Sequence, residues 1–270
     1  MFFYKLTTER KIKNLAKKII HLNFFFKFVG RVALQPFYKT IRLFTNKKRF
    51  KATLWVDWKK EVFDLWALKK NKLLYSEAQN FLLNFTKERK KIIKNLPISG
   101  SINKSSGGGG GNEALLYFLV KMISAQKVLE TGVAAGSSSR SLLEAMDTMG
   151  SGKLYSSDLA MLLDEEKVGI LVSEKYRKNW FLAKKGDKEN LPKIFKIENF
   201  FDLIYYDSDK SYSSKKWFHS LIIKNPLPKI LIYDDIDRDH FFSECVRFFK
   251  YKYKVFGNAG IIFFDEKYFK

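Results

Sequence analysis

The chain has 270 residues, of which 46% are hydrophobic and 16% aromatic, so it can bury a full core and is not disordered throughout. Its net charge of +22 is unevenly distributed, because residues 1–100 hold 24 basic and 6 acidic residues while residues 101–270 hold 26 and 22. The single cysteine, Cys245, excludes an internal disulfide bond and a zinc site of several cysteines, and a reducing compartment fits this usage best.

Residues 1–100 form a basic, aromatic-rich region that is predicted to be helical. Apolar clusters alternate with Lys and Arg at roughly helical spacing over residues 1–95, which indicates several amphipathic helices. Two interpretations are open. The helices either cap the main domain with their lysines in solvent, or they bind an anionic surface such as lipid headgroups, nucleic acid or a charged glycan.

The most apolar stretch of this region, Ile19–Phe44, is not expected to cross a membrane. Lys27, Arg31 and Lys39 interrupt it, so no run reaches the roughly 18–20 apolar residues that a span requires. No secretory signal is expected, since Met1–Tyr4 is apolar where positive charge is usual. We therefore predict a cytoplasmic protein, with peripheral contact at a membrane surface through the basic region as an alternative.

A Gly/Ser-rich tract follows the basic region. Pro97–Asn112 contains five consecutive glycines, Gly107–Gly111, and such tracts are usually flexible linkers. We place the domain boundary here, which divides the chain into a basic helical region (1–100) and a second domain (101–270). Asn112 is a favourable helix N-cap, and Glu113–Lys121 is predicted to form an amphipathic helix.

Strands and helices alternate through the second domain. The apolar runs Phe201–Asp207 and Ile230–Asp235 indicate strands buried on both faces, which is typical of parallel sheets covered by helices. Near the C-terminus, Lys254–Phe256 and Ile261–Phe264 predict a hairpin that adds an antiparallel strand at or near the sheet edge. The predicted fold class is therefore α/β, with a Rossmann-like, doubly wound and mostly parallel sheet. The other predicted strands are Lys127–Glu130, Lys153–Asp158 and Trp180–Ala183, and the other helices are Ser138–Met146, Ser213–Ile223 and Phe241–Lys250.

A glycine turn and acidic residues stand where these strands end, and in parallel sheets ligands bind beyond the carboxyl ends of the strands. The first strand leads into Glu130–Ser137, whose glycines let backbone approach a ligand and whose following helix offers free N–H groups. Asp158 lies 26 residues after Gly132, a spacing suited to an acid that hydrogen-bonds both hydroxyls of a ribose. A tight turn without a ligand is the alternative.

The motifs resemble those of the class I S-adenosylmethionine-dependent methyltransferases, over about residues 107–264. Residues 130–138 (ETGVAAGSS) are similar to the first motif of that family, residues 154–158 (LYSSD) to the second, and residues 202–212 (DLIYYDSDKSY) to the motif at the fourth strand. The last of these, together with Asp234-Asp235, is similar to the small-molecule O-methyltransferases of the catechol, caffeoyl-CoA and macrolide-sugar type.

The resemblance implies that S-adenosylmethionine is the cofactor and assigns it residues. Gly132 and Gly136 would bound the loop around its methionine part, Glu130 would support that loop, and Asp158 would hold the ribose. Asp187 falls where these enzymes place residues near the adenine. The cofactor-binding residues implied are Glu130, Gly132, Gly136, Ser137, Asp158, Asp187 and Asp207.

The resemblance also implies a divalent cation, because positions matching Asp207, Asp234 and Asp235 bind one in the metal-dependent members. The last of these is usually Asn in the family and is Asp here, which keeps an oxygen ligand and adds charge. Three carboxylates converging at two adjacent strand ends would repel one another unless a cation lay among them, and oxygen ligands suit Mg²⁺, Ca²⁺ or Mn²⁺. In the alternative, Asp207 and Asp235 cap helices or pair with Lys210.

Two residues are candidates for the catalytic base. Lys210 would act as a base only if its pKa were lowered, and a salt bridge to a neighbouring carboxylate is the alternative. His240 follows the strand that ends at Asp235, so it would either line the site or lie at the surface. Cys245 is expected to be packed in a helix rather than to act as a nucleophile.

The predicted function is transfer of the sulfonium methyl group of S-adenosylmethionine to an oxygen of a small-molecule or glycan-like acceptor, by direct displacement. Three alternatives are weighed. A nucleic-acid methyltransferase fits the basic first region, but the Asn/Asp-Pro-Pro-aromatic turn of adenine-N6 enzymes is not found after the fourth strand. An NAD-dependent oxidoreductase would have the third glycine of G-x-G-x-x-G, which is missing. A noncatalytic membrane-surface protein would not need to retain this set of acids.

Overall fold

The computed structural model describes residues 60–94, 111–159 and 167–269. The chain divides into two compact units, Met1–Val56 and Asp57–Lys270, and the described residues all belong to the second. The helices predicted before residue 60, the apolar stretch Ile19–Phe44 and most of the Gly/Ser-rich tract lie outside the described residues. Among the described helices, none is long and apolar enough to cross a membrane.

A mixed sheet, eight-stranded within the described residues, runs through this unit in the order β1-β7-β8-β6-β5-β2-β3-β4. All neighbouring strands are parallel except β8, which is antiparallel to β6 and to β7. The predicted mostly parallel sheet with a C-terminal hairpin is confirmed. The strands are β1 (Lys60–Glu61), β2 (Lys127–Thr131), β3 (Lys153–Ser157), β4 (Trp180–Ala183), β5 (Leu203–Tyr206), β6 (Ile230–Tyr233), β7 (Lys252–Phe256) and β8 (Ala259–Phe263).

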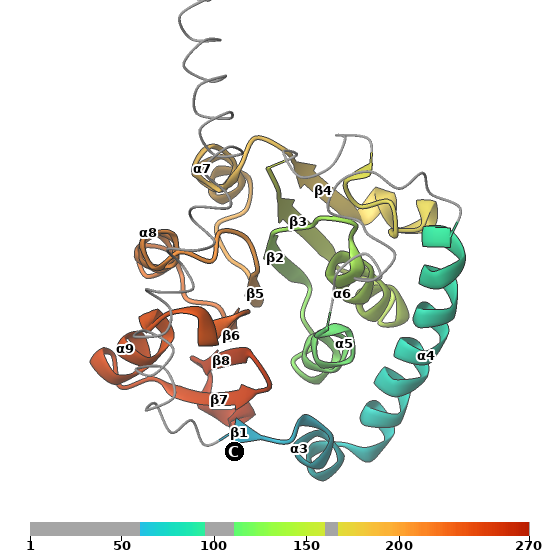
Figure 1. Cartoon of the computed structure of the whole chain (residues 1–270), viewed down its shortest axis with the longest axis horizontal. Helices are drawn as coiled ribbons and strands as arrows, with labels where there is room; N and C mark the ends of the chain where they lie inside the picture. Colours follow the sequence, from blue (N-terminus) through green and yellow to red (C-terminus); the bar gives the residue numbers. More distant parts are fainter. Residues whose placement is uncertain (1–59, 95–110, 160–166, 270) are drawn as a thin grey trace, which may run out of the picture. The chain divides into compact units, whose positions relative to one another are not determined.

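Helices cover both faces of the sheet, as Figure 1 shows: α4, α5 and α6 lie on one side, and α7, α8 and α9 lie on the other. This arrangement is the doubly wound architecture that the alternation of strands and helices predicts. The helices are α3 (Phe63–Lys70), α4 (Lys72–Lys94), α5 (Glu113–Met122), α6 (Ser137–Thr148), α7 (Asp187–Ile197), α8 (Tyr212–Ile222) and α9 (Phe241–Phe248), with short 3₁₀ helices η2 (Glu174–Asn179), η3 (Ile236–Arg238) and η4 (Glu266–Tyr268).

The alternation of side chains along each strand divides the core into two layers. Leu203 and Tyr205 of β5 pack in the cluster that includes α5 and α6, whereas Ile204 and Tyr206 pack in the cluster beneath α8 and α9. The same alternation places Glu130 of β2 on the α6 side, since its neighbour Leu129 belongs to the opposite cluster. Strand parity thus decides which helix each polar side chain at a strand end can reach.

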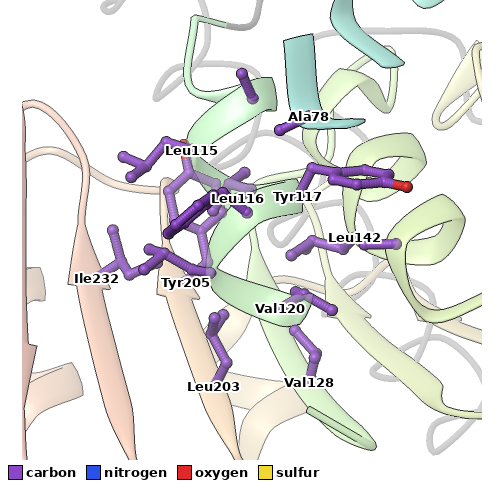
Figure 2. Packing of buried hydrophobic residues seen from close by; sticks show 14 of the residues in the cluster. Ala78, Leu115, Leu116, Tyr117, Val120, Val128, Leu142, Leu203, Tyr205 and Ile232 are labelled. Carbon is purple, nitrogen blue, oxygen red and sulfur yellow. The ribbon is translucent and has the colours of Figure 1, made fainter. Parts of the chain in front are cut away.

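Helix α5 packs across the middle of the sheet. Figure 2 shows Leu116 and Val120 of this helix lying over Leu203, Tyr205 and Ile232 of the strands. The residues from Ala114 to Val120 are all buried, so the helix contacts the sheet on one side and other helices on the other. Because nearly every residue of α5 is enclosed, its start at Glu113 is fixed relative to the strand ends.

Helices α3 and α4 belong to the same core as the sheet. Trp66 of α3 packs against Phe118 of α5 and Phe256 of β7, with ring centroids 5.6 and 5.1 Å away. Phe81 of α4 stacks on Tyr117 of α5 at 4.8 Å. For residues 60–94 the structure therefore agrees with the cap interpretation, in which aromatic faces pack on the sheet domain. The predicted boundary near residue 100 lies between α4 and α5, outside the described residues.

Several elements differ from the sequence-based expectation. Helix α7 has no predicted counterpart, because Pro192 lies inside it and proline usually ends a helix. The strand predicted as Ile230–Asp235 ends at Tyr233, so Asp234 and Asp235 lie in the loop beyond it. Asn112 stands at the predicted N-cap of α5, but its side chain makes no capping hydrogen bond.

Candidate active site

The loop between β2 and α6 lies at the carboxyl edge of the sheet, and its two glycines are required by its own backbone. Gly132 has φ +80°, and a Cβ there would lie 2.5 Å from the carbonyl oxygen of Asp207. Gly136 has φ +92° and caps α6, where a Cβ would lie 2.9 Å from the Cα of Gly169. Contacts within the protein therefore account for both glycines. Ser137, the next predicted binding residue, is buried as the first residue of α6.

Glu130, in β2, lies directly before this loop. Its carboxyl group is fully buried on the α6 side of the sheet and accepts hydrogen bonds from the hydroxyls of Ser138 and Ser139 at the start of α6. It also accepts one from Ser156 of β3 at 2.8 Å. Burial raises the pKa of Glu130 to about 7, although the three serine donors oppose this shift. One carboxyl group thus connects β2, β3 and α6.

Asp158 directly follows β3 and reaches the loop between β2 and α6, which we call the glycine loop. Its Oδ2 accepts the backbone N–H groups of Val133 at 2.7 Å and Ala134 at 3.0 Å. The side chain is half-buried, and among the described residues no hydrogen bond engages its Oδ1. The predicted convergence of Asp158 and the glycine loop is therefore present, with one carboxylate oxygen holding the loop and the other still able to accept.

Asp187, at the first position of α7, links three loops. Its carboxylate accepts from Ser157 at the end of β3 at 2.6 Å and from Ser208 after β5. Burial raises the pKa of Asp187, and the charges of Asp158 and Asp209 add to the effect against the serine hydrogen bonds. The structure thus places this residue, predicted to lie near an adenine, at the same edge of the sheet as Asp158.

The three carboxylates of the predicted metal site do converge. One oxygen each of Asp207, Asp234 and Asp235 lies within 4.8 Å of the others, and we call these residues the acidic cluster. Asp207 follows β5, and the other two follow its neighbour β6. Asp235 has φ +51°, in the left-handed region where Asn and Asp are the favoured non-glycine residues. Its side chain makes no capping hydrogen bond to η3.

Lys210 lies within the acidic cluster. Its Nζ pairs with Asp207 and lies 3.5 Å from Oδ2 of Asp235, so the structure has the ion pair that was one of its two predicted alternatives. Burial and the charge of Asp234 raise the pKa of Asp207 against the effect of Lys210. Although burial acts in the opposite direction, the charges of Lys210 and Arg238 hold the pKa of Asp235 below its usual range.

Asp234 is held by two residues that the sequence did not point to. Asn112, at the start of α5, donates to Oδ1 of Asp234 at 3.1 Å, and Tyr205 of β5 donates to Oδ2 at 3.3 Å. Both partners are neutral, and no described cation forms an ion pair with Asp234. Only the position of Asn112 beside the glycine tract was a signal in the sequence, and it was attributed to helix capping.

His240 and Cys245 occupy positions outside the acidic cluster. His240 is half-buried at the start of α9, and within the described part of the chain no contact joins its imidazole to the acidic cluster. Cys245 is buried in α9, which confirms that it is packed in a helix, and burial raises the pKa of its thiol to about 12. Its sulfur lies 3.4 Å from Nε2 of His219, a buried residue of α8.

The chain was compared with known proteins. Residues 129–236 match the model of a methyltransferase domain family. Among curated proteins, no sequence matches the chain. Solved structures of similar fold include an O-methyltransferase of Bacillus cereus in complex with S-adenosylhomocysteine (SAH), at 18% identity over 67% of this chain and 90% of that one, with a TM-score of 0.43. An SAH-bound methyltransferase of Podospora anserina has 14% identity over 66% and 86%, with a TM-score of 0.47. A methyltransferase of Geobacter sulfurreducens has 18% identity over 67% and 88%, with a TM-score of 0.47.

The family match spans the carboxyl edge of the sheet. It begins within β2, contains the glycine loop and Asp158, and ends at Ile236, just beyond the acidic cluster. At these low identities the solved structures are alike in fold alone. The match confirms the resemblance to methyltransferases that the sequence motifs predicted: residues 129–236 are similar to a methyltransferase domain family.

Proposed function

We propose that this domain transfers a methyl group from S-adenosylmethionine to an oxygen of a small-molecule acceptor. The observation that carries the proposal is the adjacency of two sets of groups at one edge of the sheet. The glycine loop, hydrogen-bonded to Asp158, closes on the backbone of Asp207, which begins the acidic cluster. A cofactor on the loop would therefore present its methyl group close to an acceptor at the cluster.

The residues of the loop fit the cofactor. Asp158 offers Oδ1 to the ribose hydroxyls, and the N-terminus of α6 offers N–H groups to the cofactor's carboxylate. When bound, the cofactor supplies an electrophilic sulfonium methyl group, so the protein needs no nucleophile of its own. The cofactor-binding set that we propose is Glu130, Gly132, Gly136, Ser137, Asp158, Asp187 and Asp207, with Glu130 acting through the loop that it supports.

The acidic cluster fits a divalent cation of the Mg²⁺ or Mn²⁺ kind. Asp207, Asp234 and Asp235 supply hard oxygen ligands from two adjacent strand ends, and no described cation forms an ion pair with Asp234. A cation held there supplies Lewis-acid stabilisation of the acceptor's developing oxyanion. Lys210 and His240 are the two proposed bases for the proton of the acceptor hydroxyl. Lys210 would first have to lose its ammonium proton to solvent, when a cation replaces it as the partner of Asp207 and Asp235.

The acceptor is proposed to be a small molecule or a glycan-like compound, because no recognition motif for nucleic acid is found among the described strand ends. Contact of the basic first region with an anionic surface stays a prediction, since most of that region lies outside the described residues.

Cofactor binding is tested by isothermal titration calorimetry with SAH. Replacing Asp158 by Ala removes a charged acceptor of a ribose hydroxyl, a loss of about 1.5–3 kcal/mol, so we expect SAH to bind roughly ten- to a hundredfold more weakly. Glu174→Ala, which removes an exposed carboxylate from η2, should leave the affinity unchanged. Binding of NAD in place of SAH and S-adenosylmethionine by the unaltered protein would instead favour the oxidoreductase alternative and reject this proposal.

The metal is tested separately, with a panel of catechol-like and sugar-hydroxyl acceptors and radiolabelled S-adenosylmethionine. If the acidic cluster binds a cation, EDTA should abolish transfer and Mg²⁺ or Mn²⁺ should restore it. Asp234→Ala should abolish turnover and leave SAH affinity nearly intact, because Asp234 is not among the proposed cofactor contacts. Transfer that is insensitive to EDTA would remove the metal from the proposal and leave the methyltransferase standing.

A further inference from the structure

Helix α8 carries a buried lysine that the proposed reaction does not use. The side chain of Lys215 is only 1% exposed. Its Nζ donates to the backbone carbonyl of Asp235 at 3.0 Å and lies 3.2 Å from Oδ2 of Asp239. Both partners belong to the loop that connects β6 to α9, so Lys215 joins α8 to that loop.

A buried ammonium is costly to keep, which makes its partners informative. Removing an ammonium group from water costs several kcal/mol, and only well-placed charges and acceptors offset that cost. Oδ2 of Asp239 is buried and accepts no hydrogen bond of good geometry, so its charge interaction with Lys215 is its main compensation within the described residues. An apolar side chain could fill the same space without this cost. The groups that Lys215 contacts therefore explain why a lysine occupies this buried position.

What Lys215 holds is the main chain of an acidic-cluster residue. The carbonyl of Asp235 accepts from Lys215 and, at 3.3 Å, from the backbone N–H of Arg238. The Asp235 backbone is in the left-handed region at φ +51°, and its Oδ1 accepts from Asn258 at 3.0 Å. A change in this backbone would swing the carboxylate away from Asp207 and Asp234.

Lys215 also connects the two loops that supply the acidic cluster. Helix α8 begins one residue after Ser211, whose side chain accepts from the backbone N–H of Ser214, and Lys210 and Asp207 lie just before it. Lys215 stands one turn into the helix and reaches across to the loop after β6. The loop after β5 and the loop after β6 are thus tied to the same turn of α8.

We propose that Lys215 is a positioning residue of the acidic cluster: by holding the carbonyl of Asp235 and the carboxylate of Asp239, it fixes Asp235 in its left-handed conformation and keeps its carboxylate beside Asp207 and Asp234. The inference rests on the proposed function in one respect, that the acidic cluster binds a divalent cation.

The test measures Mn²⁺ binding by electron paramagnetic resonance, on the full chain without acceptor. Lys215→Met removes the ammonium and keeps the length of the side chain. Because groups that orient metal ligands typically contribute 10–100-fold to affinity, we expect Mn²⁺ to bind at least tenfold more weakly, while SAH affinity changes less than twofold. The matched control is Lys216→Met, which removes an exposed lysine from the next position of α8.

The two substitutions distinguish a positioning role of Lys215 from the effect of removing a positive charge alone. Loss of a positive charge near an acidic cluster by itself strengthens cation binding, so Lys216→Met should bind Mn²⁺ as well as or slightly better than the unaltered protein. If Lys215→Met does not fold, the double variant Lys215→Met/Asp239→Asn is used, since it leaves no unpaired buried charge and still accepts the N–H of Phe241 through the Asn oxygen. Mn²⁺ affinity in the Lys215 variants that equals that of the control overturns the proposal.

A crystal structure of the same variant distinguishes this inference from the metal proposal. Should the unaltered protein bind no Mn²⁺, the metal proposal fails, and the conformation of residue 235 decides the role of Lys215 alone. Departure of Asp235 from the left-handed region in the variant supports positioning, and an unchanged φ near +51° rejects it.

Discussion

Glu130 shows how a single buried carboxyl group connects the elements around the glycine loop. It receives three serine hydroxyls from two elements and has no cation beside it among the described residues. Burial therefore raises its pKa to about 7, so the folded protein binds a proton here that the unfolded chain, with an ordinary Glu pKa near 4.5, has already lost. The stability that this group contributes is full below pH 4.5 and is lost as the pH rises through 7.

Glu130→Gln tests this sign. Gln does not titrate. Between pH 5 and 7.5 the free energy of unfolding should therefore fall less in the variant than in the unaltered protein, and the two falls should differ by at most about 3 kcal/mol. Urea unfolding at several pH values measures the difference. Asp187 and Asp207 also have raised pKa values, but their contributions are the same in both proteins and cancel in this difference. Glu174→Gln is the exposed control, and a difference that does not change with pH would contradict the assignment.

At the scale of elements, the buried aromatic face of α4 is the clearest source of stability outside the sheet. Phe85 is 1% exposed and stacks on Phe81, with ring centroids 5.7 Å apart. The guanidinium groups of Arg89 and Arg140 lie 5.5 and 5.7 Å from its ring centroid. These arginines pair with Glu113 of α5 and Glu88 of α4, so the basic character of α4 is partly used within the fold.

Phe85→Ala should therefore lower the free energy of unfolding by about 3–5 kcal/mol, the range for a large core aromatic. Leu83, on the exposed side of the same helix, gives the matched control, and Leu83→Ala should change stability by less than about 0.5 kcal/mol. Urea denaturation followed by circular dichroism measures both. Equal effects of the two substitutions would mean that α4 is not part of the cooperative core.

The strands that the sequence predicted share one property, and β1, which it did not predict, lacks it. β5 and β6 are short runs of apolar residues between polar loops, so local pattern alone indicates them. β1 has two residues and exists only because it pairs with β7, nearly two hundred positions later in the chain. The hydrogen bond from Asn112 to Asp234 likewise joins positions 122 apart, and no local signal carries such a contact. The carboxylates themselves were predictable because parallel strands end at one edge.

For the molecule as a whole, the division of the chain falls earlier than the change in charge. Residues 57–270 form one compact unit, yet the basic excess extends to residue 100. Part of that charge lies on α3 and α4, whose apolar faces complete the core of the sheet domain. Charge and folding unit are therefore different partitions of the same sequence, because charge reports on association and burial reports on the core.

Two shortened chains test this division. A chain beginning at Asp57 should unfold cooperatively and bind SAH with unchanged affinity, because it keeps the whole described core. A chain beginning at Ser101 loses Trp66 and Phe81 and exposes Phe118 and Tyr117, so we expect aggregation or loss of a cooperative transition. Thermal denaturation and size-exclusion chromatography measure both, and a monomeric, cooperatively folded chain from Ser101 would place the boundary near residue 100.

The position of β8 determines when the sheet can be completed during synthesis of the chain. β6 is flanked on one side by β5 and on the other by β8, which spans Ala259–Phe263, and β7 and β1 join the sheet only through β8. A ribosome synthesises the chain from the N-terminus, so residues 60–61 are among the first of this unit to emerge. They can join the sheet only after β7 and β8, near the end of the unit, have been synthesised. Until then β6 is an open edge, next to the loop that carries Asp234 and Asp235. A nascent chain halted before residue 259 would therefore present an unpaired apolar strand, which is the form most exposed to chaperones and to aggregation.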